Sequence, residues 1–191
     1  MNRLIKKVAV IGSGIMGSGI ACHFANIGVE VLLLDIIPNE LTDVVSLKSK
    51  PSPIYSQKFA SRITTGNTTD DMAKIAQVDW IIEVVVERLD IKKLVFEQIE
   101  KHRKPGTLIT SNTSGIPIHF MSEGRSDDFQ AHFCGTHFFN PARYLKLFEI
   151  IPGPKTSQEV LDFLFEYGSK FLGKTSVIAK DTPAFIGNRI G

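Results

Sequence analysis

The stretch "VAVIGSGIMGSGIA", residues 8–21, places Gly12, Gly14 and Gly17 in the spacing G-x-G-x-x-G. An apolar run leads into the glycines, a helix-like run follows them, and a second apolar run, "VEVLLLD", ends at Asp35. The glycine spacing is specific for a dinucleotide only in this strand–turn–helix–strand context. Glycines there permit a tight turn and let the backbone approach a pyrophosphate, whose charge lies at the helix N-terminus. The stretch therefore predicts a dinucleotide site.

Asp35 indicates which dinucleotide is bound. Its carboxylate would accept hydrogen bonds from the adenine ribose diol. Ile36 and Ile37 follow it, so no arginine or lysine stands beside it to meet a 2′-phosphate, and NAD is predicted rather than NADP. Ile15 and Met16, between the glycines, are included in the predicted cofactor site. The alternative is a glycine turn used only for packing, with Asp35 capping the end of a strand.

Short β-rich runs alternate with amphipathic helices along the rest of the chain. The predicted strands are "KKVAVI", "VEVLLLD", "WIIEVVVE", "TLITSN", "KLFEIIP" and "TSVIAK". Surface helices are predicted over residues 90–103 and 157–172, and the Ser/Pro/Lys-rich stretch "SLKSKPSPIYSQ" is predicted to be a mobile connection. Continuous apolar strands that alternate with helices are typical of an α/β fold with a mostly parallel, doubly wound sheet.

Composition excludes several classes of protein. The 191-residue chain is 43% hydrophobic and 22% charged, with a formal net charge of +2, and its charges are scattered. No run approaches the roughly 18 apolar residues that span a bilayer, and "MNRLIKKVAV" lacks the features of a signal peptide. Cys22 and Cys134 are expected to be buried thiols of a reducing compartment, with a disulfide as the alternative. We therefore expect a soluble, cytoplasmic protein with no nucleic-acid or membrane partner.

A second group of polar residues follows the predicted strand "TLITSN". Ser111, Asn112, Thr113 and Ser114 stand in a row before a glycine. Ligands of parallel sheets bind outside the carboxyl ends of the strands, where this group would lie. Serine, asparagine and glycine are also common in ordinary turns, so both interpretations remain open at this point.

Four stretches together resemble a known family. "GSGIMGSGIA", "SNTSG", "GTHFFNPARYLKLFEIIP" and "KDTPAFIGNRI" are similar, in order and approximate spacing, to the 3-hydroxyacyl-CoA dehydrogenases of fatty-acid β-oxidation. The similarity covers nearly the whole chain, and "NPARYLKL" most resembles the long bacterial forms that also carry an enoyl-CoA hydratase-like domain. The resemblance implies a Rossmann-type NAD-binding domain over residues 1–180 and NAD-dependent oxidation of 3-hydroxyacyl-CoA to 3-oxoacyl-CoA.

The resemblance also assigns expected roles to single residues. His137 matches the family's catalytic base, Glu149 its acidic partner, Ser114 a substrate contact and Asn188 a residue near the reacting oxygen. The positions that match the surroundings of NAD are Asp35, Glu87, Lys92 and Asn112. A neutral imidazole is suited to take the hydroxyl proton while hydride leaves carbon. A carboxylate on the other ring nitrogen would fix the tautomer and stabilise the imidazolium.

The same residues allow other interpretations. His137 could be a satisfied core histidine in a Phe-rich strand. His132, Cys134 and His137 could bind a metal ion, but no fourth ligand stands at a usual spacing, so no metal is predicted. The chain could be a non-catalytic NAD-binding protein of dehydrogenase descent, or a dehydrogenase of a free 3-hydroxy acid or sugar acid.

Two regions depart from the family pattern. Residues from about 38 to 66 are short compared with the helical hairpin that the family places after its second strand, which leaves the CoA contacts open. "DTPAFIGNRIG" is expected to form a helix that begins at Pro183. Residues 181–191 are therefore predicted to be the first turns of a truncated helical C-terminal domain, and a homodimer is expected only with that missing domain.

Overall fold

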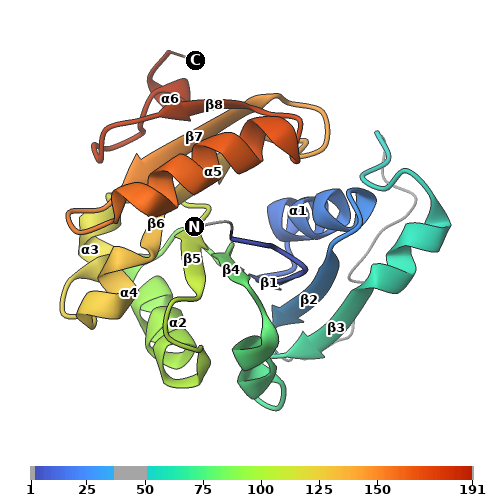
Figure 1. Cartoon of the computed structure of the whole chain (residues 1–191), viewed down its shortest axis with the longest axis horizontal. Coiled ribbons are helices and arrows are strands. Elements are labelled where there is room, and N and C mark those ends of the chain that lie inside the picture. Colours follow the sequence, from blue (N-terminus) through green and yellow to red (C-terminus); the bar gives the residue numbers. More distant parts are fainter. Residues whose placement is uncertain (1–2, 37–50, 191) are drawn as a thin grey trace.

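The strands that the structure describes form a single sheet. The structure is a computed structural model that describes residues 3–36 and 51–190. Within these ranges eight strands pair in the order β3-β2-β1-β4-β5-β6-β7-β8 (Figure 1). Their bounds are β1 Lys7–Ile11, β2 Glu30–Asp35, β3 Ile63–Asn67, β4 Trp80–Glu83, β5 Leu108–Ser111, β6 Phe133–Phe138, β7 Leu147–Pro152 and β8 Thr175–Ile178. All neighbouring pairs are parallel except β6 and β7. The predicted α/β fold with a mostly parallel sheet is confirmed.

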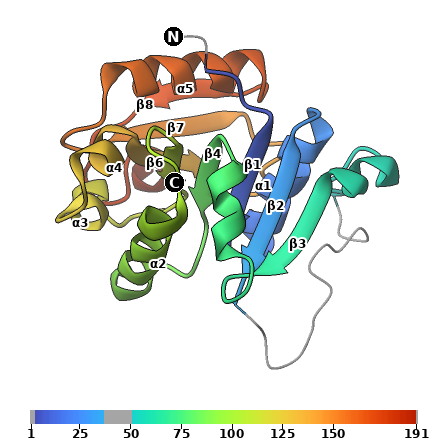
Figure 2. The ribbon, with the colours of Figure 1, turned by 60° about the horizontal axis from the view of Figure 1, so that its bottom comes forward.

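Helices cover both faces of the sheet, as a doubly wound fold requires. One face packs against α1 (Ile15–Asn26) and α5 (Gln158–Lys170), which contribute to the same buried cluster. The other face packs against α2 (Leu89–His102), α3 (Ile118–Ser122), α4 (Asp127–Ala131) and the 3-10 helix η2 (Met72–Gln77). The remaining short helices are η1 (Gln57–Arg62), which contacts α1, and α6 (Gly187–Ile190). Figure 2 shows β3 at one edge of the sheet, and β7 and β8 beside α5 at the other.

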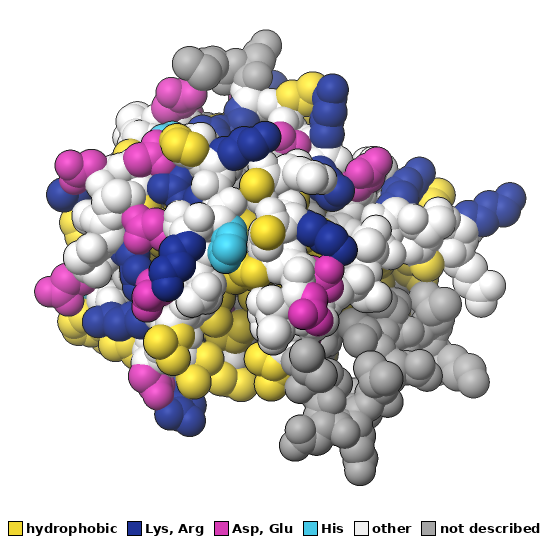
Figure 3. Space-filling view, turned by 90° about the horizontal axis from the view of Figure 1, so that it is seen from below, with side chains coloured by type: hydrophobic (Ala, Val, Ile, Leu, Met, Phe, Trp, Pro, Cys, Tyr) yellow, Lys and Arg dark blue, Asp and Glu magenta, His cyan; other side chains and the backbone are white. Residues whose placement is uncertain are grey.

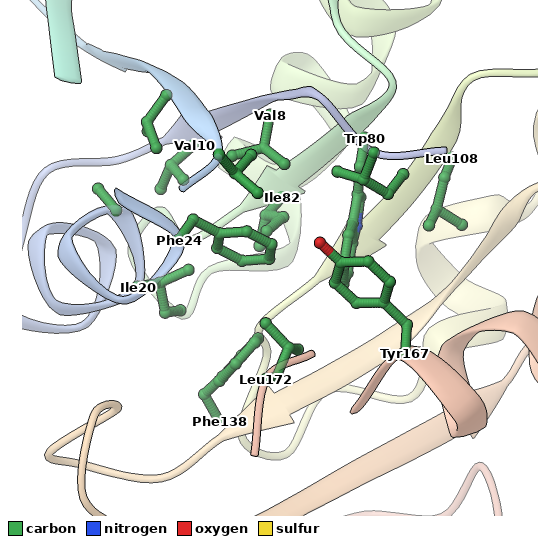
Figure 4. Close-up of a cluster of buried hydrophobic side chains, with 14 of the residues drawn as sticks. Val8, Val10, Ile20, Phe24, Trp80, Ile82, Leu108, Phe138, Tyr167 and Leu172 are labelled. Atoms are coloured by element: carbon green, nitrogen blue, oxygen red, sulfur yellow. The ribbon is translucent and has the colours of Figure 1, made fainter. Parts of the chain in front are cut away.

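Trp80 joins the two helices of the first face to the centre of the sheet. Its ring is fully buried and makes edge contacts with Phe24 of α1, at 5.3 Å between centroids, and with Tyr167 of α5, at 5.9 Å (Figure 4). The indole N–H donates to Thr110 Oγ1 at 2.9 Å, so burial leaves this donor satisfied. The core therefore fixes α1, which begins at the glycine turn, against the strand that ends beside that turn.

The segment that follows the second strand contains a strand that the sequence did not predict. Residues 37–50, including the first five residues of "SLKSKPSPIYSQ", lie outside the described residues. Within the part that is described, η1 and β3 form, and β3 pairs in parallel with β2. The sequence "ITTGN" has no apolar run because β3 is a half-exposed edge strand. Neither η1 nor β3 was predicted from the sequence between the end of that stretch and Asp70.

Two predicted boundaries also differ from the structure. The strand predicted as "WIIEVVVE" ends at Glu83, where the chain turns away from the sheet to contact the glycine turn. The helix predicted to begin at Pro183 begins at Gly187, because Ala184 and Phe185 adopt left-handed φ angles of 64° and 45°. That conformation is incompatible with a helix through these positions. None of the helices in the two described ranges is long and apolar enough to cross a bilayer.

His23 is a buried titratable group in the core beneath α1. Its Nε2 donates to the Leu172 carbonyl at 3.0 Å, and no hydrogen-bond partner for Nδ1 is present among the described residues. Burial, and then the charge of Lys174, lower the pKa of His23 from 6.5 to about 4. The folded protein therefore binds the proton less well than the unfolded chain does.

This shift predicts a pH dependence of stability. The contribution of His23 is fully retained above pH 6.5 and is lost as the pH falls toward 4, because the unfolded chain gains a proton in that window. The loss should be on the order of 3 kcal/mol, at about 1.4 kcal/mol for each pKa unit. Urea unfolding of the wild type and of His23→Gln, whose amide can still donate to Leu172, measures this term. If both proteins lose stability in parallel across the window, His23 does not carry the effect.

Candidate active site

The glycine turn connects β1 to α1 and leaves space for an anion. Gly12 has φ 107°, and a Cβ there would lie 2.6 Å from the Val84 carbonyl oxygen. A Cβ on Gly17 would lie 1.8 Å from the Gly12 carbonyl oxygen, so only glycine lets this turn close against α1. Gly14 faces open space, with no atom within 4 Å of the position a Cβ would take. The first turn of α1 has no side-chain cap and no acidic residue, which leaves its N–H groups available for a phosphate.

Asp35 lies at the rim of a cavity beside this turn. The cavity has a volume of about 760 Å³ and is lined by the glycine turn, the end of β2, the segment after β4 and α2. Asp35 accepts the backbone N–H groups of Ser13, at 2.6 Å, and Ile36, at 2.7 Å, and also the Ser13 hydroxyl. None of the described residues that line the cavity is lysine or arginine. The cavity is therefore suited to a neutral ribose diol rather than to a 2′-phosphate.

Apolar side chains form a band on the same side of the molecule. In Figure 1 the arrowheads of β2 and β3 point toward the bottom, so Figure 3, seen from below, looks onto the carboxyl ends of these strands. A band of hydrophobic side chains lies along the lower part of this face. Among the residues that line the cavity, Ile36, Val86 and Leu94 are 71%, 62% and 60% exposed. Large apolar groups exposed together mark a surface that a ligand can cover.

A buried ion pair lies behind the cavity. Lys92 of α2 and Glu83 at the end of β4 are almost completely buried, and Nζ lies 2.8 Å from Glu83 Oε1 and 3.4 Å from Glu87 Oε2. The second oxygen of Glu83 accepts the Ser111 hydroxyl at 2.5 Å. Sequence matching placed Glu87 and Lys92 around NAD, and the structure places them in an internal network at the edge of that region.

Glu87 fixes the turn that carries Ser114. Its Oε1 accepts the Thr113 hydroxyl at 2.5 Å and the backbone N–H groups of Ser114, at 2.9 Å, and Gly115, at 3.0 Å. Burial raises the pKa of Glu87, but the hydrogen bond from Thr113, the charge of Lys92 and the two N–H groups outweigh burial, so the pKa lies below its ordinary value of 4.5. The carboxylate therefore stays charged at neutral pH and keeps the turn in place.

Asn112 and Asn188 tie the same turn to its neighbours. Asn112 Oδ1 accepts the backbone N–H of Phe138 at 2.8 Å, which joins the end of β5 to β6. Asn188 Nδ2 donates to the carbonyl oxygen of Ser114 at 2.8 Å. The Ser114 side chain itself is exposed. Ser114, predicted to contact substrate, and Asn188, predicted to lie near the reacting oxygen, are thus joined by a direct hydrogen bond.

His137 and Glu149 are cross-strand partners in the antiparallel pair β6–β7. His137 Nδ1 lies 2.7 Å from Glu149 Oε2, and the two residues are 4% and 0% exposed. The Phe139 ring packs against the imidazole at 4.3 Å between centroids, and Phe185 approaches it at 6.1 Å. A carboxylate partner at Nδ1 keeps the proton of the neutral ring there, so Nε2 is the basic nitrogen.

The described residues do not form a metal site around His137. His132 Nδ1 donates to the Asp128 carbonyl at 2.8 Å, whereas His137 faces Glu149. Cys134 is a free, buried thiol, and burial raises its pKa. In the described ranges no group of three His, Cys, Asp or Glu residues is placed to hold a metal ion.

The sequence interpretation missed three parts of this site. Glu83 was treated only as a strand residue, and Ser111 only as one of a row of polar residues after a strand. A lone glutamate in an apolar strand, followed by a lysine on the next helix, could have indicated the buried pair. The backbone N–H groups of Ile186 and Gly187 donate to Glu149 Oε1 at 3.0 and 2.7 Å. No side-chain pattern could have predicted these backbone donors.

Comparison with protein families gives a match over most of the chain. Residues 7–182 match the model of the family described as 3-hydroxyacyl-CoA dehydrogenase, NAD binding domain. A Bacillus subtilis (strain 168) protein provisionally named a 3-hydroxyacyl-CoA dehydrogenase is 54% identical, over 100% of this chain and 27% of its own length. A Rickettsia felis protein provisionally named a fatty acid oxidation complex trifunctional enzyme is 42% identical, over 100% of this chain and 28% of its own length. The chain thus spans only about a quarter of these two relatives.

A solved structure has the same fold. The crystal structure of 3-hydroxybutyryl-CoA dehydrogenase from Escherichia coli K12 superposes with a TM-score of 0.85 at 35% sequence identity. The match covers 98% of this chain and 40% of that protein.

Proposed function

Because the chain belongs to the family of 3-hydroxyacyl-CoA dehydrogenase NAD-binding domains, we propose that it is the cofactor-binding part of an enzyme that oxidises a 3-hydroxyacyl-CoA to a 3-oxoacyl-CoA. The observation that carries this proposal is the buried pair of His137 and Glu149, 2.7 Å apart. A core histidine needs only one hydrogen-bond partner of any kind, whereas a buried carboxylate at Nδ1 leaves Nε2 to act as a base. The names of the relatives support a role in fatty-acid oxidation.

The residues of the glycine turn fit NAD. Gly14 leaves open space for the pyrophosphate, the uncapped first turn of α1 offers N–H groups to its charge, and Asp35 lies at the cavity rim to accept the ribose diol. Bound there, NAD would supply the acceptor for the hydride that leaves the carbinol carbon. Glu87 holds the Ser114 turn, and Lys92 pairs with Glu87 behind the cofactor region.

The chain's own residues then move one proton. His137 takes the hydroxyl proton at Nε2 as the carbon–hydrogen bond breaks, because an alcohol is too weak an acid to ionise first. Glu149 stabilises the positive imidazolium that results. Ser114 orients the substrate oxygens. Asn188 holds the Ser114 turn because its Nδ2 donates to the Ser114 carbonyl oxygen. The acyl-CoA portion supplies binding energy for this alignment.

Cofactor choice tests the role of Asp35. The chain should bind NADH at least about tenfold more tightly than NADPH, a difference of about 1.4 kcal/mol, because the carboxylate repels a 2′-phosphate. Fluorescence titration of the chain with both cofactors measures this ratio, and in Asp35→Asn the preference should narrow. Equal or tighter binding of NADPH by the wild type would refute the assignment.

Replacement of the base tests the chemistry. In the whole protein, assayed with acetoacetyl-CoA and NADH, His137→Gln should lower kcat by about 10²–10⁴-fold, the usual contribution of a positioned general base. NADH affinity should stay the same because the imidazole is assigned to the substrate. His132→Gln is the matched control: it removes a nearby histidine that bonds only to the Asp128 carbonyl and carboxylate. Equal effects of the two substitutions, or an unfolded His137→Gln protein, would favour a structural role.

A further inference from the structure

Each oxygen of Glu149 has its own partner. Oε2 faces His137 Nδ1 at 2.7 Å, while Oε1 accepts the backbone N–H groups of Ile186 at 3.0 Å and Gly187 at 2.7 Å. The carboxylate is completely buried. A buried carboxylate loses its water, and two N–H donors offset part of that loss. His137 and Glu149 thus belong to a four-residue arrangement that also includes the backbone N–H groups of Ile186 and Gly187.

The donors come from a turn with an unusual backbone. Ala184 and Phe185 both have positive φ angles, 64° and 45°, and the next two N–H groups point to the same oxygen. Successive N–H groups arranged around one anion form a concave anion site of the backbone. Phe185 is 3% exposed and packs against His137, so the turn is anchored inside the molecule.

Gly187 also packs close to Phe139, whose ring contacts the imidazole of His137. A Cβ at Gly187 would lie 2.5 Å from Phe139 Cζ and 3.6 Å from Glu149 Oε1. The Phe139 ring is the one that packs on His137 at 4.3 Å. A side chain at position 187 therefore displaces either the turn or the ring that supports the imidazole.

We propose that residues 184–187 form a positioning turn that sets the orientation of Glu149 and, through it, the tautomer of His137. The proposal rests on the proposed function, in which a bare Nε2 removes the substrate proton. The turn makes Oε1 the acceptor of two backbone N–H groups, so Oε2 alone is left to accept the Nδ1 proton. Gly187 is a positioning residue in this arrangement and touches no reacting atom.

The substitution Glu149→Gln should change the tautomer of His137 if the turn governs the orientation of residue 149. An amide has one oxygen that accepts and one NH₂ group that only donates. If the turn governs orientation, the amide oxygen must meet the N–H groups of Ile186 and Gly187, and the NH₂ group must face His137 Nδ1. Nδ1 then has to accept, and the proton moves to Nε2. If the turn has no such influence, the amide oxygen can face Nδ1 and the tautomer stays unchanged.

Nitrogen-15 NMR of the histidine rings tests this on the chain with NAD absent, under conditions where the rings are neutral. The wild type should show His137 with a protonated Nδ1, and Glu149→Gln should show the opposite tautomer. His23, whose Nε2 donates to the Leu172 carbonyl, and His132, whose Nδ1 donates to the Asp128 carbonyl, are internal references for the two forms. Retention of the Nδ1–H form in a folded Glu149→Gln protein would overturn the proposal.

Gly187→Ala provides a second test if Glu149→Gln does not fold. The added methyl group should replace the single Nδ1–H tautomer of His137 by a mixture, and lower kcat of the whole protein by up to about 10²-fold with little change in KM, the cost of a displaced catalytic group. The matched control is Gly19→Ala, whose new Cβ would meet only Ala142 at 3.7 Å and should leave kcat unchanged. An unaltered tautomer in Gly187→Ala would overturn the proposal. If the tautomers change as expected but the wild-type protein does not oxidise 3-hydroxyacyl-CoA, the proposed function fails and the positioning turn stands.

Discussion

The antiparallel pairing of β6 with β7 is the constraint on which the candidate site depends. In a sheet that is otherwise parallel, this one reversal makes His137 and Glu149 direct cross-strand neighbours. Parallel partners would need a crossover between them, and the short connection from β6 to β7 could not supply one. The cofactor region depends on the parallel half of the same sheet, where β1 lies between β2 and β4 and strand order reverses. The parallel half of the sheet thus forms the cofactor region, and the antiparallel pair forms the His137–Glu149 site.

Much of the fold and of the site could be predicted from local patterns. The glycine spacing, Asp35 and the buried apolar strands each depend on a few neighbouring residues, and the structure places them where the patterns indicate. The pairing of His137 with Glu149 was expected from the resemblance to the family, and the structure has Nδ1 of His137 2.7 Å from Oε2 of Glu149. Glu87 and Lys92 were also expected near the cofactor region, but the hydrogen bonds of Glu87 to the Ser114 turn and the ion pair of Lys92 with Glu83 were not.

What could not be predicted depends on tertiary contacts. β3 is a strand because it pairs with β2. It lies half-exposed at the edge of the sheet, so it needs no apolar residues, and its sequence carries no periodic pattern that predicts a strand. The left-handed turn at Ala184 and Phe185 contains no glycine at those two positions, so local chemistry predicts a helix there. The preference of these residues for a helix is overridden by two tertiary contacts: Phe185 packs against His137, and the N–H group of Ile186 donates to Glu149.

The dependence of Glu149 on Ile186 and Gly187 has a consequence for the order in which the molecule matures. The glycine turn, Asp35 and both strands of the His137–Glu149 pair leave the ribosome before residues 184–187 do. A chain that lacks residues 184–187 would therefore keep the glycine turn and Asp35, but Glu149 Oε1 would lose its two backbone donors. The orientation of Glu149 therefore depends on backbone that is synthesised after both members of the pair, whereas the glycine turn and Asp35 depend on none of it.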